Sequence, residues 1–152
     1  MPTEEYKTGD QIKVIINSVL DNLDLIQLLT DCITDYMNFD EDSAHEVGMS
    51  VREAVTNAIQ HGNKLDVNKR VYICFEPAAD RLRIRVRDQG DGFCAEMLPN
   101  PLEPDNLLKP TGRGIFYIRT FMDEVEFRFP IQGGTEVVMV KKIASRSQGA
   151  QI

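Results

Sequence analysis

The segment 81–88 constrains the fold more than any other part of the chain. Within it, arginine alternates residue by residue with Leu82, Ile84 and Val86. Side chains of a β-strand point alternately to its two faces, so this pattern predicts a strand with one apolar and one charged face. Strands of this kind are typical of antiparallel sheets that are covered on one face only. The same alternation directs the carboxylate of Asp88 toward the core at the end of the strand.

Further patterns predict the rest of an α+β sandwich. Alternation of apolar and polar residues indicates additional strands at 11–18, 71–75, 124–129 and 135–142. Apolar residues at helical spacing indicate helices at 22–37 and 40–61, and a third helix should begin at Gly114. We therefore expect two layers, with the helices packed on one face of a mixed, mostly antiparallel sheet.

Length and composition favour one domain over residues 1–143, followed by a disordered tail at 144–152. The chain has 152 residues, of which 42% are hydrophobic, and this is enough for one sizeable core. Prolines concentrate between 94 and 110, where they disfavour regular structure, so a long, mobile loop is expected there.

Charge and cysteine usage restrict the class of protein further. The formal net charge of -7 argues against direct nucleic-acid binding, which depends on clustered basic residues. No apolar run approaches the roughly 20 residues of a membrane span. Cys32, Cys74 and Cys94 form no CxxC pair, which speaks against structural zinc. These features predict a cytoplasmic protein without a membrane partner.

The predicted helix at 40–61 carries a polar pair on one face. Glu53 and Asn57 are four residues apart, so both project from one face. An ordinary solvated polar face is the alternative interpretation at this point. His61 lies near the same line, where it would either line a pocket or cap the helix end.

The strand at 82–88 ends in the sequence DQGDG. A buried carboxylate is costly unless it is hydrogen-bonded, and an amino group of a ligand would satisfy Asp88. Alternatively, local backbone amides satisfy it within a turn in which Gly90 and Gly92 supply positive φ angles. The inward direction of Asp88 favours the ligand.

A second glycine-containing sequence, TGRG at 111–114, precedes the third predicted helix. Glycine lets a phosphate approach the backbone, and a helix N-terminus favours anions. A flexible hinge is the alternative for a GxG sequence alone. The chain lacks GxxxxGK[ST], so a Walker-type phosphate loop is excluded.

The charged face of the strand at 81–88 also has two interpretations. It would form either an interaction surface or a solvated face whose charge is neutralised by Glu124, Glu126 and other acids. The second interpretation is the more economical, because exposed charged faces are common.

The order of these segments resembles that of the GHKL (Bergerat-fold) ATPases. EAVTNAIQHGN (53–63), DQGDGF (88–93) and TGRGIF (111–116) are similar to the N, G1 and G2 boxes of that family. The short domain with EAVTNAIQHG most resembles the serine/threonine kinases that act as anti-sigma factors. The resemblance implies a two-layer Bergerat sandwich with a mobile ATP lid, and ATP and Mg²⁺ as ligands.

The same resemblance implies a role for each matching residue. Glu53 would activate the attacking hydroxyl, and Asn57 would hold Mg²⁺ through its amide oxygen. Asp88 would accept a hydrogen bond from the adenine amino group, with Thr135 also reading adenine. The remaining residues would line the nucleotide pocket or contact the phosphates: His61, Gly90, Gly92, Thr111, Gly112, Arg113 and Gly114.

The function implied is phosphorylation of an anti-anti-sigma protein of the STAS type, together with binding of a sigma factor. Members of this branch are often homodimers, although the apolar patterning identifies no stripe for such an interface. Two alternatives stay open: a nucleotide-gated binding module without phosphotransfer, and a detached ATPase domain of the histidine-kinase type.

Overall fold

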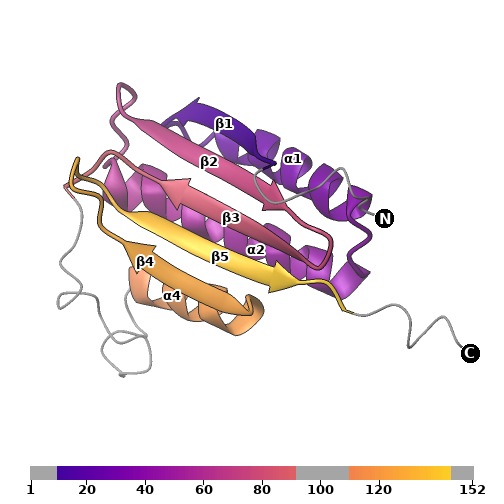
Figure 1. The fold of residues 1–152 in the computed structure, drawn as a ribbon. Coiled ribbons are helices and arrows are strands. Elements are labelled where there is room, and N and C mark those ends of the chain that lie inside the picture. The colour runs from indigo at the N-terminus through magenta and orange to yellow at the C-terminus, as the bar shows by residue number, and fades with distance from the viewer. Residues whose placement is uncertain (1–9, 92–109, 145–152) are drawn as a thin grey trace, which may run out of the picture.

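The computed structural model describes residues 10–91 and 110–144, with the side chains of 110–113 excepted (Figure 1). The elements follow one another as β1 (Ile12–Asn17), α1 (Asn22–Tyr36), α2 (Glu41–Asn57), η1 (Ala58–Gly62), β2 (Arg70–Pro77), β3 (Arg81–Arg87), α4 (Pro110–Phe121), β4 (Glu124–Arg128) and β5 (Glu136–Lys142). None of the helices in these ranges is long and apolar enough to cross a bilayer.

The strands form one five-stranded sheet in the order β1-β2-β3-β5-β4, and each neighbouring pair is antiparallel. All helices of the described residues lie on one side of this sheet, and none of them covers the other side, which is called the open face below (Figure 1). The predicted α+β sandwich is therefore confirmed.

The central strand β3 follows the alternation expected from the sequence. Ile84 pairs with Phe75 of β2 and Met139 of β5, and all three side chains are fully buried beneath the helices. The arginines of β3 are partly exposed on the open face. Asp88 follows in phase and is only 5% exposed, so the prediction of an inward carboxylate is confirmed.

The predicted helix at 40–61 is not one continuous α-helix. Asp40 caps α2 by accepting a hydrogen bond from the backbone amide of Ser43 (2.7 Å). After Asn57 the chain widens into the π-helical turn η1, and the amide of Asn63 donates to the carbonyl of Ala58. Such turns insert an extra residue into a helix and occur frequently at functional sites.

The start predicted for the third helix is wrong. Helix α4 begins at Pro110 rather than Gly114. Proline suits the first position of a helix, because the amide that it lacks would have no partner there and its fixed φ is already helical. The TGRG sequence thus forms the first turn of the helix. The predicted lid and tail lie outside the described residues, apart from Pro110 and Ala144.

A buried lysine joins α4 and α2 to the sheet. Lys141 of β5 donates from Nζ to the backbone oxygen of Phe121, at the C-terminal end of α4 (2.6 Å). The same Nζ lies 3.3 Å from a carboxylate oxygen of Glu46 on α2. Its side chain is only 11% exposed, so both contacts are largely shielded from water.

Candidate nucleotide site

A small cavity of about 50 Å³ lies between the helices and the end of the sheet. Residues from α2, η1, α4 and three strands surround it. Its lining consists of Ala54, Asn57, Ala58, His61, Gly62, Val86, Asp88, Ile115, Ile118, Phe127, Thr135 and Val137. Most of these side chains are apolar, so Asn57, His61, Asp88 and Thr135 stand out as its polar groups.

Asp88 is the buried ionisable group of this cavity. Its Oδ1 accepts hydrogen bonds from the backbone amides of Gly90 (2.9 Å) and Thr135 (3.1 Å). Burial raises the pKa of the carboxyl above its ordinary value, although these two bonds and the charges of Lys69 and Arg87 act in the opposite direction. Both hydrogen bonds found among the described residues end on Oδ1, so Oδ2 accepts none from the described part of the chain.

Glycines allow the backbone to pack directly around this carboxylate. A Cβ at Gly62 would collide with the carboxylate of Asp88, and a Cβ at Gly90 would collide with the carbonyl of Gly62. A Cβ at Gly134, which has φ +83°, would collide with the carbonyl of Asp88. The position of Asp88 is therefore set by close backbone packing from three separate segments.

Asn63 fixes the loop that carries Asp88, and the sequence interpretation gave it no separate role. The fully buried side chain donates from Nδ2 to Ser18 Oγ (2.8 Å) and to the carbonyl of Arg70 (3.0 Å). Its Oδ1 accepts from the amide of Gln89 (2.7 Å). The sequence did contain a signal for this role: Asn63 is a polar residue directly after Gly62, the glycine that ends the predicted helix.

Gln89 extends the same network on the far side of the loop. Its Oε1 accepts from the backbone amide of Arg70 (2.6 Å), and its Nε2 donates to the hydroxyl of Tyr72 (3.1 Å). The loop after β3 is thereby tied to both the helix end and β2, which makes the surroundings of Asp88 rigid.

The first turn of α4 lies against Glu53 and Asn57. A Cβ at Gly114 would be 2.7 Å from Oε2 of Glu53 and 3.1 Å from Nδ2 of Asn57. The structure thus brings together two of the three segments singled out by sequence, and Asp88 joins them across the cavity. A carboxylate, an amide and a helix N-terminus meet here, and groups of these kinds bind phosphates and their cations in proteins.

The remaining predicted residues are placed as follows. His61 lines the cavity but keeps an exposed side chain, and Thr135 is buried and contributes its amide to Asp88. Thr111, Gly112 and Arg113 fall in the first turn of α4, where side chains are not described. Gly92 lies outside the described residues.

Residues 17–141 match the family described as histidine kinase-like ATPase domain. The chain belongs to that family. The match runs from the end of β1 to the end of β5, so it contains the cavity and all segments around it. Membership accounts for the common location of the three sequence boxes, and it makes ATP the expected ligand of this histidine kinase-like ATPase domain.

Curated relatives of this ATPase domain are serine-protein kinases. It is 31% identical to serine-protein kinase RsbW of Bacillus subtilis, over 88% of this chain and 86% of the relative. It is 32% identical to RsbW of Bacillus licheniformis, over 89% and 87% of the two chains, and 30% identical to RsbW of Staphylococcus epidermidis, over 90% and 89%.

A solved structure supports the fold independently. The RsbU and RsbW domains of Rv1364c from Mycobacterium tuberculosis superpose with a TM-score of 0.65 at 14% identity. The match covers 89% of this chain and 33% of that longer chain. At this identity the similarity establishes the architecture of the ATPase domain alone.

Proposed function

We propose that the protein is an ATP-dependent serine/threonine protein kinase and an anti-sigma factor, which binds a sigma factor and phosphorylates a STAS-type anti-anti-sigma protein in the cytoplasm. The observation that carries the proposal is the buried Asp88, which lines a cavity together with Asn57. The similarity to serine-protein kinases named RsbW supports the choice of reaction.

The polar groups of the cavity fit an adenine nucleotide. The adenine amino group would donate to Asp88, whose other oxygen is already held by two backbone amides. Thr135 and Gly90 would border the base. An exocyclic amine provides the donor that a buried, partly satisfied carboxylate needs, and a base lacking that amine would leave the carboxylate unpaired.

Asn57 would hold Mg²⁺ together with the phosphates and water. Among the described residues, no group of three or more His, Cys, Asp or Glu side chains is placed to hold a metal ion. Magnesium commonly keeps several waters and takes few protein ligands beside phosphates, so one amide oxygen suits it. Gly112, Arg113 and Gly114, with Thr111, would contact the phosphates from the first turn of α4.

Glu53 would accept the proton of the attacking hydroxyl on the protein substrate. It is next to Asn57 along the helix face and close to Gly114, so it borders the expected phosphate position. Phosphoryl transfer depends mainly on positioning and on neutralising charge, and a correctly placed carboxylate completes such a site.

The cavity must enlarge to admit ATP. Its volume of about 50 Å³ is far below the roughly 300–1,000 Å³ of ordinary ligand pockets. Ile115 and Ile118 of α4 contribute part of its wall. We therefore expect the nucleotide to displace the N-terminal half of α4, which also carries the phosphate-contacting residues.

The proposal is tested by calorimetric titration with ATP and Mg²⁺, followed by incubation with labelled ATP and candidate STAS proteins. Asp88→Asn should abolish binding, whereas the matched control Asp91→Asn, an exposed acid in the same loop, should bind normally. Glu53→Gln should bind ATP but transfer no phosphate. Absence of ATP binding by the parent protein would refute the proposal.

Binding without transfer to any STAS protein would favour the second candidate, a nucleotide-gated module that regulates a partner through ATP-dependent ordering. Sedimentation of the same samples would test the homodimer that the family resemblance implies.

A further inference from the structure

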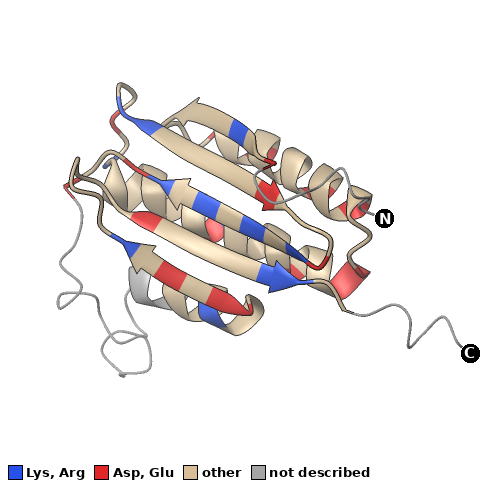
Figure 2. Ribbon diagram, in the orientation of Figure 1, with Lys and Arg blue, Asp and Glu red and all other residues tan. Residues whose placement is uncertain are grey.

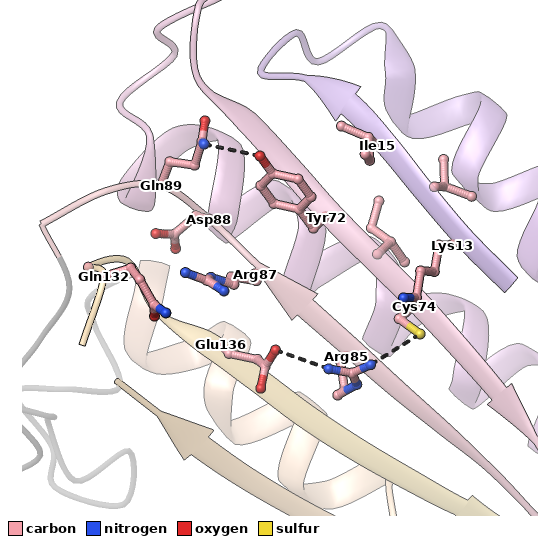
Figure 3. Close-up of a pocket in the computed structure, with 13 residues that line it drawn as sticks. Lys13, Ile15, Tyr72, Cys74, Arg85, Arg87, Asp88, Gln89, Gln132 and Glu136 are labelled. Atoms are coloured by element: carbon pink, nitrogen blue, oxygen red, sulfur yellow. Dashed lines mark hydrogen bonds and ion pairs between the residues drawn. The ribbon is translucent and has the colours of Figure 1, made fainter. Parts of the chain in front are cut away.

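The open face of the sheet contains a groove of about 610 Å³, and Asp88 of the candidate nucleotide site lines one end of it (Figure 3). Strand register places Ile15, Tyr72, Arg87 and Glu136 in one row across β1, β2, β3 and β5. Lys13, Cys74 and Arg85 form the next row. The groove thus combines an apolar side near β1 with a basic centre on β3.

The other arginines of β3 are paired with carboxylates. Arg81 lies 3.7 Å from Glu124, and Arg83 lies 2.6 Å from Glu76. Arg85 lies 3.3 Å from Glu76 and 3.6 Å from Glu136. At Arg81, Arg83 and Arg85, the interpretation as a face whose charge is neutralised by acids is therefore confirmed.

Arg87 differs from its neighbours on the same strand. Its side chain makes no hydrogen bond or ion pair with any of the described residues, although its charge acts on the carboxyl of Asp88 in the same groove. Its Nε is buried without a hydrogen-bond partner, as is the Nε of Arg85. In Figure 3 its guanidinium lies in the groove between Gln132 and Tyr72. A partly buried guanidinium without an acceptor is unfavourable, so this position favours an anion supplied from outside.

The surroundings of Arg87 define what such an anion should be attached to. Ile15 and Tyr72, in the same row, are 54% and 37% exposed and provide an apolar surface. Lys13, in the adjacent row, also has no carboxylate partner among the described residues. Figure 2 shows the basic residues of β3 as a band across a chain whose overall charge is -7.

We propose that this groove docks a segment of a protein partner in which an acidic residue adjoins a large apolar one. The carboxylate would form a bidentate pair with Arg87, and the apolar side chain would cover Ile15 and Tyr72. A second copy of this chain suits the groove less well, because two copies face to face would oppose the same basic bands. The proposal does not depend on phosphotransfer, although Asp88 lines both this groove and the candidate nucleotide cavity.

The test uses a fluorescein-labelled peptide of alternating glutamate and leucine, titrated with the full chain and followed by fluorescence anisotropy. We expect saturable binding that weakens with added salt, and no binding of the corresponding lysine-leucine peptide. Arg87→Gln should weaken binding about tenfold or more, since it removes a charge-assisted hydrogen-bond pair. Arg83→Gln, which removes the same charge from the same face outside the groove, should change it less than about twofold.

A second variant tests the apolar half of the groove. Ile15→Ser alters an exposed side chain, so the fold should persist, and peptide affinity should fall about threefold to tenfold. Equal losses in Arg87→Gln and Arg83→Gln would overturn the proposal, because they would indicate unspecific charge attraction. Absence of peptide binding together with a dimer that Arg87→Gln dissociates would also overturn it, and would assign the groove to a second copy.

Discussion

Replacing Gly62 by alanine separates the packing around Asp88 from general effects on the helix. The new methyl group would collide with the carboxylate of Asp88 and lie 2.9 Å from its Cβ. Gly62 does not have a positive φ, so the backbone itself accepts alanine. Any effect therefore arises from the collision with a side chain that two backbone amides hold in place.

The expected magnitude follows from three contributions. Overpacking of a tight interior costs about 1–3 kcal/mol, and weakened hydrogen bonds to Asp88 add about 1 kcal/mol. Alanine returns up to about 1 kcal/mol through its higher helix propensity. The net loss of stability is about 1–3 kcal/mol. If the carboxylate is displaced, its bond to adenine is lost as well, and ATP should bind roughly tenfold to a hundredfold more weakly.

Gly48→Ala is the matched control, because Gly48 is also helical and closely packed. Its added Cβ would lie 2.7 Å from Nε2 of Gln27, which is the end of a flexible side chain and can move away. The melting temperature of Gly62→Ala should therefore lie about 4–8 °C below that of Gly48→Ala, with weaker ATP binding by calorimetry. If both variants melt and bind ATP alike, Asp88 is not held by this packing and the reasoning is wrong.

Three further variants test the site. Burial raises the pKa of Asp88 above its ordinary 3.8, so its contribution to stability is favourable below that value and is lost as pH rises through the folded-state pKa. Asp88→Asn should therefore have a higher melting temperature than the parent at neutral pH, and the difference in melting temperature should disappear toward pH 3.8. A difference that stays constant with pH would contradict the raised pKa of Asp88. Gly114→Ala should impair phosphotransfer, because its methyl group meets Glu53 and Asn57, yet change unfolding free energy by less than about 1 kcal/mol; an unaltered rate would contradict the contact. Asn63→Ala should lose about 3 kcal/mol in urea unfolding, since it leaves buried polar groups unpaired, and a loss below about 1 kcal/mol would refute its role in fixing the loop.

Local alternation was sufficient to predict the sheet and the direction of Asp88. Along β3 every second residue points to the same face, and Asp88 comes two residues after the buried Val86, so the same alternation places it in the core. Helices α1 and α2 were also apparent from their apolar spacing, with α1 differing from its predicted range by one residue at the end, whereas the start of α4 was placed four residues too late. These features depend on neighbours in sequence, which is why a pattern reveals them.

Features that depend on contacts between distant segments were not predictable in the same way. The π-helical turn at Ala58–Gly62 inserts one extra residue into a helix over only five residues. So short a change does not visibly alter the helical spacing of apolar residues in the sequence. In the sequence alone, Asn63 resembles a surface residue. Its buried role depends on hydrogen bonds with Ser18 and Gln89, which are distant in sequence. The pairing of Arg85 but not Arg87 likewise depends on the positions of Glu76 and Glu136 on neighbouring strands.

The anchoring of α4 by Lys141 has a mechanical consequence. The lysine holds the C-terminal end at Phe121, whereas the N-terminal end lies beside Glu53. A helix of 12 residues is about 18 Å long, so a tilt of roughly 10° about the fixed end would move the free end by about 3 Å. If the nucleotide binds as proposed, the fixed end of α4 lies at the far end of the helix from it, so a small rotation about Phe121 would produce a large change in the space available for the phosphates.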